Sequence, residues 1–274
     1  MRVLVSLSPC LLVRLSLCLC ASGVISLLSG CCSSPDAIPK REIRVAAAAD
    51  LRFALDELVG EFQRQQPNIE VKVTYGSSGN FYAQLCNRAP FDVFLSADID
   101  YPRKLIEHDL APKNSEFNYA VGVLVLWAPK SCPLNFDKSG IEALLDPAVK
   151  KIAIANPKHA PYGRAAEAAL KKLGVYDRVA DKFVTGENVM QTAQFVDAGA
   201  DVGLIPLSLA LAPAMRDKGR YWEVPRDAYP PLAQGGVVLS WAQDREAANA
   251  LRDFLAGAEG KAVLRRYGFL IPGE

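Results

Sequence analysis

The sequence predicts an α/β protein built from two units of strands and helices, between which the chain passes twice. Strands and helices alternate over residues 43–96 and again over residues 151–206, a pattern typical of parallel sheets covered by helices. Long apolar strands are expected at residues 119–128 and 235–241, on either side of the second unit. This order predicts a chain that crosses to a second unit and then returns.

The first unit begins with an apolar strand over residues 43–49. Asp50 follows it and precedes a helical apolar stripe, so we expect Asp50 to cap that helix. The remaining elements are a strand at 70–75, the turn Gly76-Ser77-Ser78-Gly79, a helix at 81–89 and a strand at 92–96.

The second unit repeats the alternation. Its expected elements are strands at 151–155, 183–185 and 202–206, with helices at 163–173 and 189–198. Two closing helices, at 245–257 and 259–267, should pack back on the first unit. The predicted domains are therefore a signal peptide at 1–30, a tether at 31–42, a first lobe of 43–120 plus 230–274, and a second lobe of 121–229.

The first 30 residues have the composition of an export signal. They contain Arg2 and Arg14, no acidic residue, and an apolar run at 15–28 that ends in small residues. The run is too short to span a bilayer comfortably. We therefore expect an exported protein, in the periplasm or on the outer face of the cell envelope.

The segment Leu28-Ser29-Gly30-Cys31 resembles the lipobox of bacterial lipoproteins. The resemblance implies that Cys31 becomes the first mature residue and carries lipid, which would attach the protein to the membrane through a short polar tether. A secreted protein without lipid is the alternative.

Charge argues against a nucleic-acid partner. Removal of residues 1–30 takes away two of the 31 basic residues and none of the 30 acidic ones, which leaves a formal charge of −1. A chain with that balance lacks the basic surface that nucleic acids need. An anionic ligand would have to be captured by a local site.

The sequence has little material for catalysis. Only His108 and His159 are present, and no nucleophile elbow, phosphate loop or dinucleotide fingerprint occurs. Beyond Cys31 the mature chain keeps Cys32, Cys86 and Cys132, whose spacing fits no metal site. Cys86 and Cys132 could pair or could be buried thiols. We expect neither an enzyme nor a cofactor.

Helix starts are the most informative feature. The turns at Ala49-Asp50, 77–79, 161–163 and Asn188-Val189 would each leave free backbone N–H groups at a helix N-terminus. Such donors, with the helix dipole, bind anions without a counter-charge. In open α/β sheets these turns gather at the carboxyl ends of the strands. The pattern predicts an oxyanion site enclosed from two sides.

Four segments, at 46–51, 75–79, 89–98 and 266–269, resemble the periplasmic molybdate-binding protein family. The resemblance runs from about residue 43 to 269. It implies a type II periplasmic-binding-protein fold, a molybdate or tungstate ligand, a monomer, and delivery to the membrane subunits of an ABC importer. A receptor for sulfate or phosphate, or an enzyme on the same scaffold, is the alternative.

The resemblance also implies a site of neutral donors. Its members are Ala49, Asp50, Ser78, Tyr162 and Val189. We expect the Asp50 carboxylate to turn away from a dianion and cap its own helix, leaving the backbone N–H to bind. Pro206 occupies the place where some relatives have a binding tyrosine, so Tyr162 is expected to supply the phenol instead.

Overall fold

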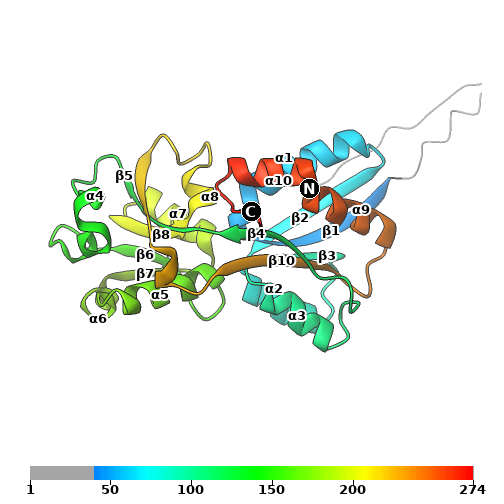
Figure 1. Ribbon diagram of the computed structural model, residues 1–274, viewed down its shortest axis with the longest axis horizontal. Helices are drawn as coiled ribbons and strands as arrows, with labels where there is room; N and C mark the ends of the chain where they lie inside the picture. The colour runs from blue at the N-terminus through cyan, green and yellow to red at the C-terminus, as the bar shows by residue number, and fades with distance from the viewer. Residues whose placement is uncertain (1–39, 274) are drawn as a thin grey trace, which may run out of the picture. The chain divides into compact units, whose positions relative to one another are not determined.

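The computed structural model describes residues 40–273, so the signal peptide, most of the tether and Cys31 lie outside the described residues. The described chain forms two mixed sheets of five strands each (Figure 1). The strand orders are β2-β1-β3-β10-β4 in the first sheet and β7-β6-β8-β5-β9 in the second. In each sheet three parallel strands are followed by one that runs antiparallel to its neighbours. The predicted α/β fold with two sheets is therefore confirmed.

The first sheet is covered on both faces. Its strands are β1 (Arg41–Ala48), β2 (Ile69–Gly76), β3 (Val93–Ser96), β4 (Phe117–Gly122) and β10 (Leu232–Val238). Helices α1 (Arg52–Gln65), α9 (Arg245–Ala256) and α10 (Ala258–Arg266) share one apolar core with it, and α2 (Ser78–Cys86) and α3 (Asp100–Glu107) share another. The closing helices thus pack on the first sheet, as the sequence predicts (Figure 1).

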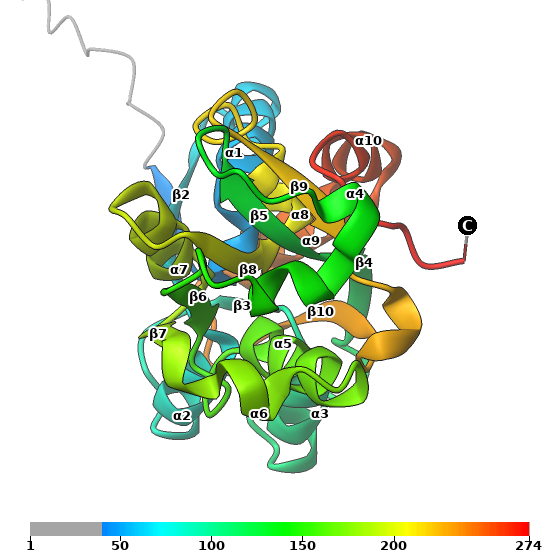
Figure 2. The same cartoon turned by 90° about the vertical axis from the view of Figure 1, so that its left-hand side faces the viewer.

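The second sheet has one continuous core. Its strands are β5 (Leu124–Pro129), β6 (Ile152–Ala155), β7 (Phe183–Gly186), β8 (Val202–Pro206) and β9 (Gly219–Glu223). Its helices are α4 (Phe136–Ser139), α5 (Pro161–Lys172), α6 (Tyr176–Val179), α7 (Val189–Asp197) and α8 (Leu207–Ala210), with 3-10 turns η2 (Gly140–Leu145), η3 (Ala180–Lys182) and η4 (Arg226–Ala228). Figure 2, which faces this sheet, shows α5 and α6 along one side of the strands.

The chain crosses from the first sheet to the second at Val123, between β4 and β5. The prediction of one continuous strand over 119–128 is therefore wrong. The Val123 carbonyl accepts a hydrogen bond from the backbone N–H of Leu207, and the Leu124 N–H donates to the Tyr229 hydroxyl at 3.1 Å. The return runs from β9 through η4 to β10. Hydropathy cannot reveal this break because the residues on both sides of it are buried.

Cys86 and Cys132 are both free thiols. Cys86 is exposed at the end of α2, and Cys132 is partly buried. Neither the disulfide nor the pair of buried thiols considered from the sequence is therefore correct. Among residues 40–273, no helix is both long and apolar enough to cross a membrane.

Candidate functional site

A small cavity with about 210 Å³ of empty space lies between elements of the two sheets. It is lined by Ala48, Ala49, Asp50, Gly76, Ser77, Ser78, Ala97, Ala160, Pro161, Tyr162, Asn188 and Val189. All five residues predicted for oxyanion binding belong to this lining, and the lining contains no lysine, arginine or histidine. The structure therefore brings the predicted helix starts together around one cavity.

The start of α2 supplies a buried hydroxyl. Ser78 is completely buried, and its Oγ accepts a hydrogen bond from the backbone N–H of Ala97 at 3.0 Å. Within the described chain the Ser78 hydroxyl has no hydrogen-bond acceptor of its own, so its proton is available to a ligand. Ser77 caps the same helix by accepting from the N–H of Asn80 at 3.4 Å. Ser77 therefore caps the helix, and Ser78 is left to donate its hydroxyl proton to a ligand.

At the start of α7, two backbone N–H groups are used by the helix cap and a third is left free of it. The Asn188 Oδ1 accepts from the N–H groups of Met190 and Gln191, at 2.9 and 3.1 Å. The Val189 N–H takes no part in this cap, and Val189 lines the cavity. A first-turn N–H has no partner inside its own helix. Val189 is therefore placed to donate to an anion from the second sheet.

Helix α5 begins at the cavity because Gly163 has no side chain. A Cβ at Gly163 would lie 2.3 Å from the carbonyl oxygen of Ala155, at the end of β6. Pro161 is the first residue of the helix, where its missing N–H costs nothing. Tyr162 comes next and is buried against the cavity. The Pro-Tyr-Gly sequence thus fixes where the tyrosine enters the site.

Asp50 does not cap a helix, so that prediction is wrong. A 3-10 turn, η1 (Ala49–Leu51), precedes α1 and contains Asp50, and neither helix start has a side-chain cap. The Asp50 carboxylate instead accepts a hydrogen bond from the side-chain amide of Gln234, at 2.5 Å from Nε2 to Oδ2. The extra turn moves Asp50 into the helical segment, where its carboxylate meets the buried amide from β10.

The Asp50 carboxylate belongs to a buried polar cluster. Gln234 Nε2 also donates to the Tyr162 hydroxyl at 3.3 Å, and the Ser208 hydroxyl donates to the Asp50 carbonyl at 2.8 Å. Burial raises the pKa of the Asp50 carboxyl to about 6, and the hydrogen bond from Gln234 is the largest opposing effect. Burial, reinforced by the Asp50 charge, raises the pKa of the Tyr162 phenol well above its ordinary value. The phenol therefore stays neutral.

The comparisons with known proteins identify the family. Residues 43–270 match the family described as Bacterial extracellular solute-binding protein. The chain belongs to this family. It is 39% identical over 229 residues to the molybdate-binding protein ModA of Azotobacter vinelandii, covering 83% of this chain and 89% of that protein. It is 38% identical over 230 residues to ModA of Rhodobacter capsulatus, covering 84% and 88%.

A solved structure supports the same assignment. The periplasmic molybdate-binding protein of Azotobacter vinelandii superposes with a TM-score of 0.76 at 33% identity, covering 84% of this chain and 99% of that chain. The fold and family are those of solute-binding proteins, so the expectation of a binding protein and not an enzyme is confirmed.

Sequence reasoning missed three residues near the cavity of this solute-binding protein. Gln234 is completely buried in β10, and a lone amide among apolar residues was the available signal. Arg164 of α5 and Asp98, which follows β3, form an ion pair across the two sheets. Their sequence positions resemble those of ordinary surface charges, so no sequence signal marks this pair.

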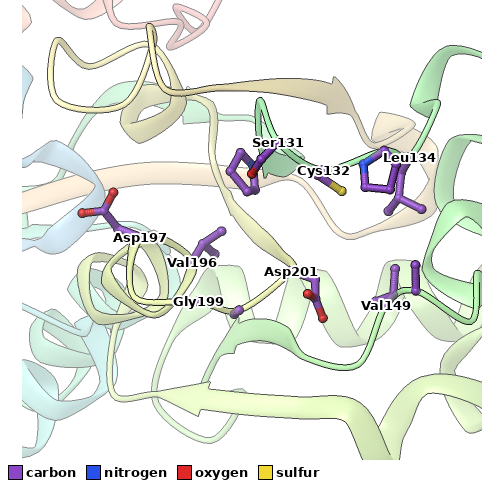
Figure 3. A pocket seen from close by; sticks show the side chains of 12 residues that line it. Ser131, Cys132, Leu134, Val149, Val196, Asp197, Gly199 and Asp201 are labelled. Carbon is purple, nitrogen blue, oxygen red and sulfur yellow. The ribbon is translucent and has the colours of Figure 1, made fainter.

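A larger hollow, with about 780 Å³ of empty space, lies beside β5 and the end of α7 (Figure 3). Asp197 and Asp201 are among its lining residues. It opens at the carboxyl end of α7, where the helix dipole disfavours an anion. Both features make this hollow unsuitable for an oxyanion.

Proposed function

We propose that this protein captures molybdate outside the cytoplasm and delivers it to the membrane subunits of an ABC importer. The observation that carries the proposal is the convergence of neutral donors from three helix starts on one cavity without a cationic lining. Such donors suit a tetrahedral dianion. The names of the relatives, which are molybdate-binding proteins, support the choice of ligand.

The proposed contacts divide between the two sides of the cavity. From the first side we assign the backbone N–H groups of Ala49 and Asp50 and the hydroxyl of Ser78. From the second side we assign the backbone N–H of Val189 and the phenol of Tyr162. The burial of these residues supports the assignment, because donors shielded from water bind an oxyanion more strongly.

The two sides correspond to two proposed lobes. We assign residues 43–120 and 230–274 to the first lobe and residues 121–229 to the second. A ligand that touches both lobes favours the closed state over an open one. Contacts that already join the two sheets support this view, including the hydrogen bond from the Gly79 N–H to the His159 carbonyl at 2.9 Å.

Three finer features complete the proposal. Tungstate should bind as molybdate does, since the two dianions are close in size and shape. The Leu28-Ser29-Gly30-Cys31 segment supports a lipid anchor at Cys31, which incorporation of radiolabelled palmitate into the wild type, and not into Cys31→Ser, would verify. The protein should act as a monomer, with a mass in light scattering that does not depend on concentration.

Titration calorimetry with molybdate, tungstate, sulfate and phosphate tests the ligand. We expect binding of molybdate and tungstate and a rise in Tm, because a ligand that binds only the folded state stabilises it. Ser78→Ala should weaken molybdate binding about 10-fold to 100-fold by removing one charge-assisted hydrogen bond.

Ser115→Ala is the matched control. It removes another buried hydroxyl, whose Oγ donates to the Pro112 carbonyl at 2.7 Å and does not line the cavity. We expect this variant to bind molybdate as the wild type does. Tighter binding of sulfate or phosphate than of molybdate would overturn the assignment of the ligand.

A further inference from the structure

The Asp50 carboxylate is an unusual member of a dianion site. It is 1% exposed and lines the same cavity as the proposed donors. Of its two oxygens, Oδ2 accepts from Gln234, whereas Oδ1 has no hydrogen-bond partner among the described residues. The Oε1 of Gln234 is also buried without a partner. The Asp50 carboxylate also interacts with the Tyr162 hydroxyl. Two buried oxygen acceptors, Asp50 Oδ1 and Gln234 Oε1, are nevertheless left without a hydrogen-bond partner within the described residues.

A proton on Asp50 would correct this mismatch. A protonated carboxyl is a donor as well as an acceptor, so it could donate to the Gln234 amide oxygen or to an oxyanion. An ionised Asp50 would instead place a further negative charge beside a dianion, in surroundings that screen charge poorly. The hydrogen bond gained by the acid and the repulsion suffered by the carboxylate both favour the protonated form of Asp50 once the dianion is bound.

The groups that face Asp50 supply no compensating cation. Gln234 faces it from β10 and Tyr162 from α5, and Ser208 of α8 binds its carbonyl. Val189 of α7 and Tyr119 of β4 are neutral neighbours, and the Tyr119 hydroxyl donates to the Ser96 carbonyl. On α1, Arg52 is exposed and paired with Asp56. Asp50 is therefore the group in this cluster that titrates near neutral pH.

We propose that Asp50 takes up one proton from solvent when the oxyanion binds, which couples ligand capture to pH; this inference rests on the proposed function. The carboxylate becomes a carboxylic acid, and no other bond is made or broken. Because the free carboxyl has a pKa of about 6 and a nearby dianion raises it further, uptake occurs above pH 6. Affinity should then fall as pH rises, by at most tenfold per pH unit.

Calorimetry at pH 7 in buffers of different ionisation enthalpy measures the protons taken up. We expect between about 0.5 and 1 proton per molybdate for the wild type, and none for Asp50→Asn. Asparagine suits the cluster, since its amide can donate to Gln234 Oε1 while its oxygen still accepts from Nε2. The dissociation constant of Asp50→Asn should be independent of pH from 6.5 to 8.5 and lower than that of the wild type at pH 8.5.

Asp92→Asn is the matched control. Asp92 is also buried, accepts from the N–H groups of Arg44 and Gln243, and does not line the cavity. This variant should keep the proton uptake of the wild type. Molybdate binding by the wild type without proton uptake overturns the inference while leaving the proposed function intact, as does uptake retained by Asp50→Asn. Absence of molybdate binding by the wild type at every pH overturns both.

Discussion

Arg164 and Asp98 form an ion pair that joins the two sheets beside the candidate site. The guanidinium Nη2 of Arg164 donates to Asp98 Oδ2 at 2.5 Å, and its Nη1 donates to the Tyr101 hydroxyl at 3.1 Å. Arg164 lies on α5 of the second sheet, and Asp98 and Tyr101 belong to the segment that leaves β3 of the first. The pair can form only while the two sides are together, so it would stabilise the closed state proposed above.

Replacing Arg164 should therefore accelerate ligand release. The pair is partly exposed, and such pairs contribute up to about 1 kcal/mol. We expect Arg164→Ala to raise the molybdate dissociation rate about 2-fold to 5-fold in stopped-flow measurements, with little change in Tm without ligand. Arg103→Ala, which breaks an ion pair with Glu116 that does not cross between the sheets, is the control and should leave the rate unchanged. Equal dissociation rates for the wild type and both variants would show that the Arg164–Asp98 ion pair does not slow ligand release.

Gly79 gives a second way to test closure. A Cβ at this position would lie 2.6 Å from the His159 carbonyl oxygen and 2.9 Å from the Tyr101 hydroxyl. Gly79→Ala should therefore prevent full closure and weaken molybdate binding by at least about tenfold in calorimetry. Gly60→Ala is the control, because a Cβ there meets nothing within 4 Å. Gly60 lies inside α1, so its replacement should raise stability slightly.

The order of strands and helices was predictable because apolar runs of strand length alternate with helical stripes in both units. Predicted strand 202–206 coincides with β8, and most other boundaries differ by one to three residues. Strand β9 and helices α3, α4, α6 and α8 were not predicted. All are short, and β9 is largely exposed, so it has no apolar run to mark it.

The gathering of the helix starts was also predictable, since strand-to-helix turns meet at one edge of a parallel sheet. The orientation of Asp50 was not. Capping depends on whether α1 begins directly after β1, and the 3-10 turn at 49–51 intervenes. Gln234, which binds the carboxylate, lies 184 residues away. Local sequence carries no information about such a partner.

Asp50 should also make stability depend on pH in the absence of ligand. Its pKa is about 6 in the folded protein, against 3.8 for an ordinary aspartate. The folded state thus binds this proton more tightly than the unfolded chain, so the contribution of Asp50 is full below about pH 4 and is lost as pH rises past 6.

Asp50→Asn removes the loss of stability that the ionisation of Asp50 causes at high pH. Relative to the wild type, the variant should gain roughly 2 to 3 kcal/mol in free energy of unfolding between pH 4 and pH 8. Urea denaturation at both pH values measures the change. A difference between the two proteins that is the same at pH 4 and pH 8 would show that Asp50 ionises normally in the folded state.

The phenol of Tyr162 is the tyrosine donor of the proposed site. Its hydroxyl accepts from Gln234 Nε2 at 3.3 Å and also interacts with the Asp50 carboxylate. We expect the phenol proton to turn to the oxyanion once the ligand is bound. Tyr162→Phe keeps the buried ring and removes the hydroxyl, which also takes away one acceptor from Gln234 Nε2. Molybdate should bind about 5-fold to 20-fold more weakly, as expected for the loss of one hydrogen bond. Tyr119→Phe is the control, because it loses a buried hydrogen bond to Ser96 without touching the cavity. An unchanged dissociation constant for Tyr162→Phe, measured by calorimetry, would remove Tyr162 from the set of ligand-binding residues.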